Sequence, residues 1–491
     1  MANPPDPSPA GERAARIGVD LRRLPWVRPL AADYAFDFRA VEPFFSGDPS
    51  QAAAWRQAIA RAQARKRQPE QIATVIAAQQ RRRNAPARAV ENGRRLAEPG
   101  TVAVITGQQA GLFGGPLYTL LKALTAVKLA EQVSRDHQVT AVPVFWVEAE
   151  DHDWDEVRGC TVFDEGLTPR SVALPARPAS DSSPVAAVRL DDSVRVAIDE
   201  LERLLPATEF RAGILQGLRE TYAPGTGMAD AFACWIERIL GDQGLIVYDA
   251  SDLASKPLAA AVFAQELSAP GATSNLAGAA GARLEACGYH AQVHAAADGM
   301  ALFSLEGGRQ LIRRQDGAFL IGDTSCAPAA LVRQATENPA AFSPAVLLRP
   351  VVQDTLFPSI CYVGGPSELA YLGQLREVYD RFDVPMPLIY PRTTATLVDS
   401  AALRFLQKYD VSLESLQPQD EAGLNALLKA QIPPIVEESV AQASAAIEAA
   451  MARVAAAVPA LDPTLEGAAK STLGRMQHDL ETLRGKIIQA A

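Results

Sequence analysis

The feature that most constrains the fold is a strand, a glycine turn and a helix in direct succession, found twice in the chain. In the first copy, residues 101–132, the apolar residues 102–105 predict a short buried strand. Gly-Gly-Pro at 114–116 then begins a helix with apolar side chains at helical spacing. In the second copy, within 347–397, apolar strand runs lead to Gly-Gly-Pro at 364–366 and another helix. This pattern predicts an α/β sheet whose parallel strands open onto a ligand crevice at their carboxyl ends.

The first glycine turn has the elements of an anion site, because free N–H groups and the helix dipole point toward it. Its spacing is neither the dinucleotide fingerprint nor the Walker loop, so it predicts only that a ligand approaches the backbone. Gln108 and Gln109 add amide groups at the tip, and Tyr118 and Lys122 share a helix face one turn apart. Ordinary helix surface is the alternative for Tyr118 and Lys122.

A dense acidic segment follows another buried-strand run, in VPVFWVEAEDHDWDEV at residues 142–157. Six acids surround His152: Glu148, Glu150, Asp151, Asp153, Asp155 and Glu156. Carboxylates packed at a strand end repel one another, so some must bind cations or donors, or hold protons. The alternative is a solvated acidic turn.

Composition indicates an intracellular globular enzyme. A net charge of −10 argues against a general nucleic-acid binder, and no run approaches the roughly 20 apolar residues that span a bilayer. The N-terminus has no signal-peptide core, and residues 1–12 resemble a disordered tail. Five cysteines without a C-x-x-C pair fit a reducing compartment. We therefore expect a cytoplasmic protein without membrane or nucleic-acid partners.

Basic residues concentrate in residues 55–98, which hold eleven Lys or Arg against three acids. The runs 65–67 and 81–83 lie in a helix-like region rich in Gln and Ala. No aromatic interleaving or binding module accompanies them, so a nucleic-acid patch is disfavoured. A solvated helix face, or a surface facing an acidic partner subunit, is the preferred interpretation.

Between the two glycine turns the pattern changes. Residues 174–188 form a Pro/Ser-rich linker with helical patterns after it, and residues 244–251 predict a core strand ending at Tyr248 and Asp249. Residues 289–322 predict a β-meander, with Asp-Gly and Gly-Gly turns at regular intervals. His290 and His294 would alternate onto one strand face. Without an apparent third ligand, structural histidines are favoured over a zinc site.

The C-terminal segment predicts two long helices that fold back on each other. Apolar residues recur at 3-4 spacing in two series, Val440, Ala443, Ile447, Ala450, Val454, Ala457 and Leu461, then Leu473, Met476, Leu480, Leu483 and Ile487. Asp462 is a candidate helix cap and Pro463 a first helical residue. The last helix, about 28 residues, would be roughly 42 Å long. Dimerisation along it is preferred, and a hairpin packed on its own core is the alternative.

Three long motifs resemble the BshC family, cysteine ligases of bacillithiol biosynthesis. They are TGQQAGLFGGPLYTLLKA, PVFWVEAEDHDWDEV, and RPVVQDTLFPSICYVGGPSELAYLGQLREVY followed by PMPLIYPR, within roughly residues 100–395. The resemblance implies a Rossmann-like core with two connecting insertions, then a C-terminal coiled coil that pairs two subunits. It implies a reaction that joins the carboxylate of L-cysteine to the amine of glucosaminyl-malate, the last step of bacillithiol biosynthesis.

These observations divide the chain into seven segments. Residues 1–99 are a tail and a helical segment packing on the core, and residues 397–491 are the dimerising coiled coil. The core comprises 100–157, the strand 244–254, and 346–396. The two insertions, the second with the β-meander, are 158–243 and 255–345.

Amide formation from a carboxylate in water requires activation, so we expect ATP, with Mg²⁺ a candidate companion. The predicted catalytic residues are Glu150, Asp151, His152, Asp153 and Lys122, with Glu150 and Asp151 as candidate Mg²⁺ ligands. The predicted substrate-binding residues are Thr106, Gly107, Gln108, Gln109, Gly114, Gly115, Tyr118, Gln353, Asp354, Tyr362, Gly364, Gly365, Glu368 and Arg392.

Two other functions remain open at this stage. A metal-dependent hydrolase would use the acidic segment to activate water and would turn over without ATP. A non-catalytic dimeric scaffold would bind a small ligand, and replacing Glu150, Asp151 and His152 would leave its role intact.

Overall fold

The computed structural model describes residues 18–178, 181–294, 296, 298–416, 422–431, 433–462 and 464–490. The predicted N-terminal tail lies outside these residues. The described chain divides into a core unit, residues 28–395, and a second unit made of residues up to 27 together with those from 396 onward. The segment 18–27 therefore groups with the C-terminal residues, whereas the rest of the predicted segment 1–99 belongs to the core unit.

The core is built on a five-stranded sheet in the order β12-β11-β1-β2-β5. All its strand pairs are parallel, and its strands are β1 (Val102–Gln109), β2 (Ala141–Glu148), β5 (Ile246–Asp249), β11 (Ser359–Gly364) and β12 (Leu388–Pro391). Their apolar residues are buried on both faces, as expected for a parallel sheet covered by helices. The predicted α/β class and the strand ending at Tyr248 and Asp249 are confirmed.

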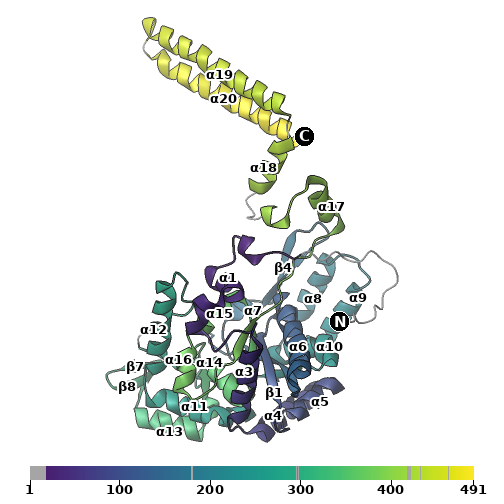
Figure 1. Cartoon of the computed structure of the whole chain (residues 1–491), viewed down its shortest axis with the longest axis vertical. Helices are drawn as coiled ribbons and strands as arrows, with labels where there is room; N and C mark the ends of the chain where they lie inside the picture. The colour runs from purple at the N-terminus through teal and green to yellow at the C-terminus, as the bar shows by residue number, and fades with distance from the viewer. Residues whose placement is uncertain are drawn as a thin grey trace. The chain divides into compact units, whose positions relative to one another are not determined.

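Helices cover both faces of this sheet (Figure 1). On one face, α3 (Ala52–Ala64) and α6 (Tyr118–His137) pack against Val102 and Val104. On the other face, α4 (Pro69–Arg83) and α14 (Arg349–Leu356) belong to the cluster that holds Ala103 and Ile105. The remaining helices of the N-terminal segment are α1 (Pro29–Phe36), α2 (Phe38–Val41) and α5 (Ala87–Arg95). Alternate side chains of β1 thus anchor opposite layers.

The run that precedes the second glycine turn is not all strand. The stretch 347–397 was predicted to contain apolar strand runs, but near its start α14 forms, with Pro350 in its first turn. Proline is tolerated there because the first N–H groups of a helix need no partner within it. The strand of this unit is β11, which leads through Gly365 into α15 (Pro366–Leu372). A further helix, α16 (Arg376–Arg381), follows.

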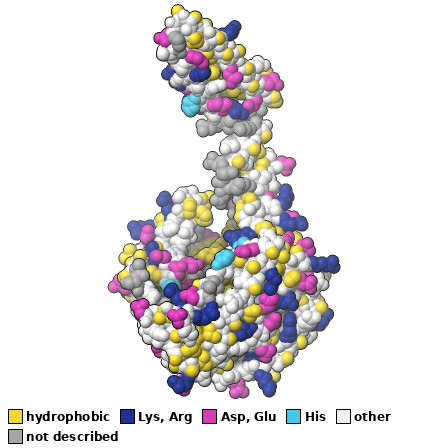
Figure 2. Space-filling view, turned by 90° about the vertical axis from the view of Figure 1, so that its left-hand side faces the viewer, with side chains coloured by type: hydrophobic (Ala, Val, Ile, Leu, Met, Phe, Trp, Pro, Cys, Tyr) yellow, Lys and Arg dark blue, Asp and Glu magenta, His cyan; other side chains and the backbone are white. Residues whose placement is uncertain are grey.

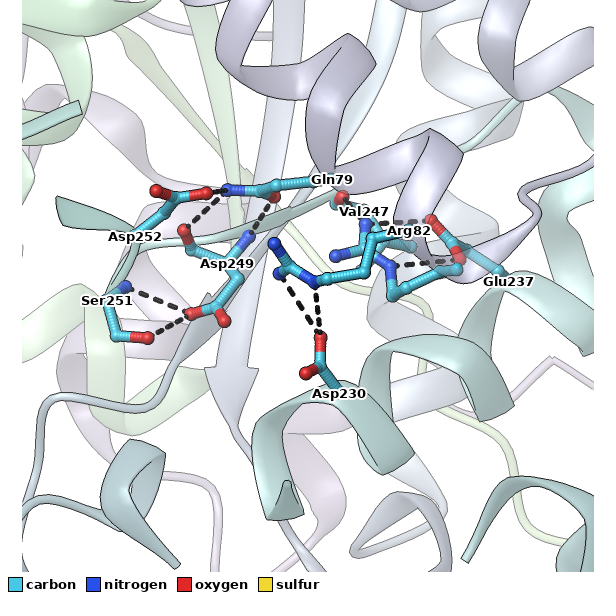
Figure 3. A network of polar contacts seen from close by, with 9 residues as sticks. Gln79, Arg82, Asp230, Glu237, Val247, Asp249, Ser251 and Asp252 are labelled. Atoms are coloured by element: carbon cyan, nitrogen blue, oxygen red, sulfur yellow. Dashed lines mark hydrogen bonds and ion pairs between the residues drawn. The ribbon is translucent and has the colours of Figure 1, made fainter. Parts of the chain in front are cut away.

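The first insertion comprises a β-hairpin and three helices. Its elements are β3 (Gly159–Phe163), β4 (Pro169–Ala173), α7 (Trp154–Val157) just before them, α8 (Ser193–Leu204), α9 (Arg211–Thr221) and α10 (Met228–Leu240). The buried Arg83 of α4 donates to Glu237 of α10 and to Val247 of β5, and its neighbour Arg82 pairs with Asp230 (Figure 3). The interpretation of the basic run as a solvated face is therefore wrong for Arg83, because an acid of the same chain pairs with it.

The second insertion contains a separate antiparallel sheet in the order β10-β6-β7-β8-β9. Its elements are α11 (Lys256–Ser268), α12 (Ala272–Ala286), β6 (Gly299–Ser304), β7 (Gln310–Gln315), β8 (Ala318–Ile321), β9 (Thr324–Cys326), α13 (Pro328–Glu337) and β10 (Phe342–Pro344). The predicted meander is present, but it begins later than expected. His290 and His294 precede β6 outside any strand, so their predicted shared strand face is wrong.

The C-terminal unit ends in an antiparallel helical hairpin, α19 (Pro434–Ala457) and α20 (Leu465–Ala490), which lie side by side in Figure 1. Arg484 pairs with Glu437, and Gln477 donates to Glu448. Shorter helices α17 (Ser400–Tyr409) and α18 (Ala422–Gln431) come before it. Asp462 accepts from the N–H of Thr464. The predicted position of Pro463 lies outside the described residues.

The apolar seam of α19 differs from the prediction in its second half. Met451, Ala455 and Val458 are partly buried, whereas Val454 and Leu461 are exposed. A strict seven-residue repeat drifts around a straight helix, so the buried stripe moves to the next residue. Residues 434–460 also form one helix long and apolar enough to cross a membrane by length and composition alone. The sequence predicted no segment long and apolar enough to span a bilayer, and this helix is an exception by length and composition.

Candidate functional site

The main candidate site is a cavity of ≈ 740 Å³ at the carboxyl ends of β1 and β11. In the sheet β1 lies between β2 and β11, so the chain connections diverge at this point. Ligands of open α/β sheets bind at such a switch point. Four cations and four acids line the cavity: Lys122, Arg309, Arg349, Arg392, Glu148, Asp151, Glu156 and Glu368. Basic and acidic side chains are likewise interspersed on the face of the core that Figure 2 shows.

Lys122 and Glu368 join the two halves of the site. Lys122 comes from α6, which follows β1, and Glu368 from α15, which follows β11. The Lys122 Nζ lies 2.7 Å from Glu368 Oε2 and 3.3 Å from Gln108 Oε1, and the lysine side chain is 1% exposed. Burial lowers the pKa of Lys122, and the Glu368 carboxylate opposes that shift. Lys122 is therefore a buried cation, and ordinary helix surface is the wrong interpretation.

Glu368 also accepts hydrogen bonds from its own turn. The Gly365 N–H donates to Glu368 Oε2 and the Tyr362 hydroxyl to Oε1, each at 2.7 Å. The carboxylate thus caps α15, as expected for an acid near a helix N-terminus. Because this turn already carries its own negative charge, it is a poor place for a ligand phosphate.

Gln109 holds two acids together on the opposite wall. Its Nε2 donates to Asp151 Oδ2 at 3.0 Å and to Glu156 Oε2 at 2.8 Å. Asp151 also pairs with Arg309, at 3.2 Å. The first glycine loop therefore positions the acidic segment through a side-chain amide.

Arg309 reaches the site from the β6–β7 turn of the second insertion. Its side chain is 9% exposed, and its guanidinium lies 3.7 Å from the centre of the Phe303 ring. The Arg309 Nη1 that pairs with Asp151 also lies 3.2 Å from His152 Nδ1, and a guanidinium can only donate. The same His152 Nδ1 lies 3.3 Å from Asp151 Oδ1, so Arg309, Asp151 and His152 form one cluster at the rim of the cavity.

Arg349 lies on the cavity wall between aromatic rings. Its Cζ is 5.9 Å from the centres of both the Trp146 and the Tyr362 rings. It donates to Gln353 Oε1 at 3.1 Å and to the Tyr371 hydroxyl at 3.2 Å. Burial opposes its charge, but Tyr371, Tyr362 and Glu148 together hold the pKa of Arg349 above its ordinary value.

The structure brings together ten of the predicted site residues along the cavity wall: Gly107, Gln108, Gln109, Tyr118, Lys122, Asp151, Tyr362, Gly365, Glu368 and Arg392. Arg392 lies 5.2 Å over the Tyr118 ring. The other nine lie outside that lining: Thr106, Gly114, Gly115, Glu150, His152, Asp153, Gln353, Asp354 and Gly364. His152 remains at the rim through its contact with Arg309.

Glu150 is buried away from the cavity wall. It forms an ion pair with Lys256 of α11 and accepts from the Ser343 hydroxyl at 3.3 Å. Burial raises the pKa of Glu150, which Lys256 counteracts. Asp153 instead caps α7, by accepting from the Glu156 N–H. These two acids support the acidic segment, so their predicted place in the cavity is wrong.

The second half of the first glycine loop is covered by the first insertion. The buried Tyr222 hydroxyl accepts from the Gly114 N–H at 3.2 Å and donates to the Gly111 carbonyl at 3.3 Å. A Cβ on Gly114 would lie 3.0 Å from the Trp235 ring, and its φ is +99°. The anion cradle predicted for the loop 106–115 therefore does not extend to Gly114, where aromatic side chains fill the space, whereas Gly107, Gln108 and Gln109 line the cavity.

Three further predicted contacts are internal. Gln353 and Asp354 lie on buried α14 rather than at a strand end, and the Tyr379 hydroxyl donates to Asp354 Oδ2 at 2.5 Å. Thr106 donates to the Val363 carbonyl, which ties β1 to β11. Gln353 still influences the site indirectly, because it holds Arg349.

The described residues contain no group of three or more His, Cys, Asp or Glu side chains placed to hold a metal ion. Glu150 and Asp151 have different partners, Lys256 for the former and Gln109 and Arg309 for the latter. The predicted pairing of these two carboxylates on one Mg²⁺ does not fit this arrangement.

Sequence reasoning missed the two arginines that most change the electrostatics of the site. Arg349 had a usable signal, since it is a lone charge within an apolar run and lies in one of the recognised motifs. Arg309 had none, because it follows a Gly-Gly turn of the distant second insertion. Only the fold brings it to Asp151.

Comparisons with known proteins agree with this architecture. Residues 19–393 match the model "Bacillithiol biosynthesis BshC, N-terminal Rossmann-like domain", and residues 395–491 match the model of the BshC C-terminal coiled-coil domain. A relative from Salinibacter ruber is 32% identical over 94% of this chain and 84% of its own length. Relatives from Solibacter usitatus, at 34% over 81% of this chain and 74% of its own length, and Symbiobacterium thermophilum, at 32% over 98% and 86%, are similar. Each is named "Putative cysteine ligase BshC". The chain therefore belongs to the BshC family, with a Rossmann-like core and a C-terminal coiled coil.

Proposed function

We propose that this protein joins the carboxylate of L-cysteine to the amine of glucosaminyl-malate, at the expense of ATP, in bacillithiol biosynthesis. The observation that carries the proposal is the cavity at the β1–β11 switch point, which four cationic and four acidic side chains line. Carboxylates and phosphates require cations, and substrate ammonium groups require acids. Membership of the BshC family supports the same reaction.

The chemistry sets the order of events. A carboxylate oxygen of cysteine attacks a phosphorus atom of ATP, which releases diphosphate or ADP and gives an acyl-adenylate or acyl-phosphate. The amine then attacks the activated carbonyl carbon and expels AMP or phosphate, which carries away that oxygen. The amine must lose its proton before or during this attack, because an ammonium has no free electron pair.

Residues on the cavity wall suit these steps. Lys122 and Arg392 neutralise negative charge that develops on the transferred group. His152 at the rim, next to Arg309 and Asp151, accepts the proton of the attacking amine. Mg²⁺ takes one or two protein carboxylates plus phosphate oxygens. Asp151 and Glu156, which Gln109 holds together, fit that requirement better than the buried Glu150.

The proposal is tested with the full-length chain, ATP, Mg²⁺, L-cysteine and glucosaminyl-malate, by weighing trapped thiol products. We expect a product at the summed mass of the two substrates less one water. Lys122→Met should lower kcat/KM by about 100-fold or more, as for loss of a group that stabilises developing charge. Lys128→Met is the matched control, because Lys128 lies on the same helix but is exposed and paired with Glu131.

Equal loss in both lysine variants would contradict the assigned role of Lys122. A folded wild-type protein that forms no product, yet cleaves a substrate without ATP, would favour the hydrolase alternative. Ligand binding without turnover of any substrate would favour the scaffold.

A further inference from the structure

The charges on the cavity wall fall into two groups. Lys122 pairs with Glu368 at 2.7 Å, and Arg309 pairs with Asp151 at 3.2 Å. The other four are Arg349, Arg392, Glu148 and Glu156, and none has an oppositely charged partner within 4.0 Å among the described residues. A cavity that holds uncompensated charges of both signs fits a ligand that carries both signs.

Two of these charges contact the same indole ring. The Trp146 Nε1 donates to Glu148 Oε2 at 3.1 Å, and the Arg349 Cζ lies 5.9 Å from the centre of the Trp146 ring. Trp146 itself is buried, in contact with Tyr248 and Phe357. The guanidinium and the carboxylate therefore both lie next to the Trp146 side chain.

Both groups retain capacity for a ligand. The hydrogen bonds of Arg349 to described residues go to the neutral acceptors Gln353 Oε1 and Tyr371 OH, and a guanidinium has five N–H donors. Glu148 accepts from two neutral donors, the Trp146 Nε1 and the Glu150 N–H. Neither group forms an ion pair within 4.0 Å among the described residues, so each can bind an ion of the opposite sign.

We propose that Arg349 and Glu148 form a subsite for the zwitterionic head of an α-amino acid, with the ligand carboxylate on Arg349 and its ammonium on Glu148. The identity of that amino acid as cysteine rests on the proposed function. The charge of Glu148, which acts on Arg349, disfavours a phosphate there, because like charges repel. Lys122 is a weaker candidate for the carboxylate, because its ammonium already donates to Glu368 and Gln108.

The test compares three thiols by isothermal titration calorimetry with the full-length protein. L-Cysteine has both charges, cysteamine lacks the carboxylate, and 3-mercaptopropionate lacks the ammonium. A lost charge-assisted hydrogen bond corresponds to about 10- to 100-fold in affinity. We expect wild-type protein to bind each analogue more weakly than L-cysteine by about that factor.

Wild-type protein should prefer L-cysteine over both cysteamine and 3-mercaptopropionate, and each variant should lose one of these two preferences and keep the other. In Arg349→Gln, the ratio of cysteine to cysteamine affinity should fall to near one, and the ratio to 3-mercaptopropionate should persist. Glu148→Gln should give the reverse result. A general structural defect would instead weaken the binding of all three thiols and leave both affinity ratios as in the wild type. Arg392→Gln is the matched control, since Arg392 also lines the cavity and has no acidic partner within 4.0 Å among the described residues.

The assignment would be overturned if the ratio of cysteine to cysteamine affinity fell to one in Arg392→Gln rather than in Arg349→Gln. It would also be overturned if wild-type protein bound all three thiols equally or bound none of them. The proposed function can fail separately. Zwitterion binding with the expected ratios but no ligase product would support the subsite and contradict the reaction. Formation of the ligase product, together with wild-type affinity ratios in Arg349→Gln, would support the reaction and contradict the subsite.

Discussion

At the scale of single residues, the Lys122–Glu368 pair connects the electrostatics of the site to its chemistry. Lys122 is buried, and the Glu368 carboxylate is the largest influence that keeps it protonated. Glutamine at 368 would keep the size and an oxygen for the Gly365 N–H but would lose the charge. The pair therefore offers a pH test in which the direction of the effect is known.

We predict that Glu368→Gln moves the alkaline fall of kcat/KM to lower pH. The carboxylate raises the pKa of Lys122, so its removal lowers that pKa, and the lysine loses its proton at a lower pH. The measurement is the pH profile of ligase activity. Glu131→Gln removes the partner of exposed Lys128 on the same helix and should leave the profile unchanged. An unshifted alkaline limb in Glu368→Gln would show that Lys122 does not control the rate.

At the scale of elements, a side chain of the first insertion supports the first glycine loop. Tyr222 satisfies both the Gly114 N–H and the Gly111 carbonyl, and Phe113 between them has a positive φ of 55°. A non-glycine residue in that conformation is held by its surroundings. Here the Phe113 ring packs edge-on against the Tyr222 ring, with centroids 5.3 Å apart.

We predict that Tyr222→Phe lowers the free energy of unfolding of the core by about 1 kcal/mol, because both hydrogen bonds of the buried hydroxyl are lost while the Gly114 N–H keeps its bond to the Gly111 carbonyl. Urea unfolding followed by tryptophan fluorescence measures this change. Tyr390→Phe is the control: Tyr390 is partly buried, its side chain makes no hydrogen bond to another described residue, and we expect a change within about 0.5 kcal/mol. Equal effects of both substitutions would contradict the assigned role of the Tyr222 hydroxyl.

The elements also show where sequence reasoning was sufficient. Apolar runs predicted β1, β2, β5 and β11, because buried parallel strands have a strong local signature. The anion cradle at Gly114 failed because Trp235 and Tyr222, over 100 residues away, fill it. Glu150 resembled its acidic neighbours in the sequence, and only the position of Lys256 separates it from them. Local patterns located the site, whereas long-range partners decided which side chains face the cavity.

At the scale of the whole molecule, the C-terminal hairpin leaves apolar side chains uncovered. Met476 and Leu483 are 43% and 52% exposed and lie seven residues apart on α20, so they share a face. Leu461, at the hairpin turn, is 86% exposed. We propose that a second copy of the chain covers this face, as the expected dimerisation requires.

We predict that Met476→Glu combined with Leu483→Glu converts a dimer to a monomer, because two charges would be buried without partners. Light scattering coupled to size-exclusion chromatography measures the mass. Leu253→Glu is the control, since Leu253 is an equally exposed leucine of the core unit, at 61%. A monomeric wild type, or an unchanged dimer in the double variant, would contradict this interface.

The central claim is that the protein activates the carboxylate of cysteine for amide formation. The most direct measurement supplies L-cysteine with both carboxylate oxygens labelled as ¹⁸O, together with ATP, Mg²⁺ and glucosaminyl-malate, and weighs all products. We predict an amide that keeps one labelled oxygen, with the other in AMP or in phosphate. AMP would establish an adenylate intermediate, and phosphate an acyl-phosphate. Amide formation with no label in either product, or no amide from a folded protein that binds its substrates, would contradict the account.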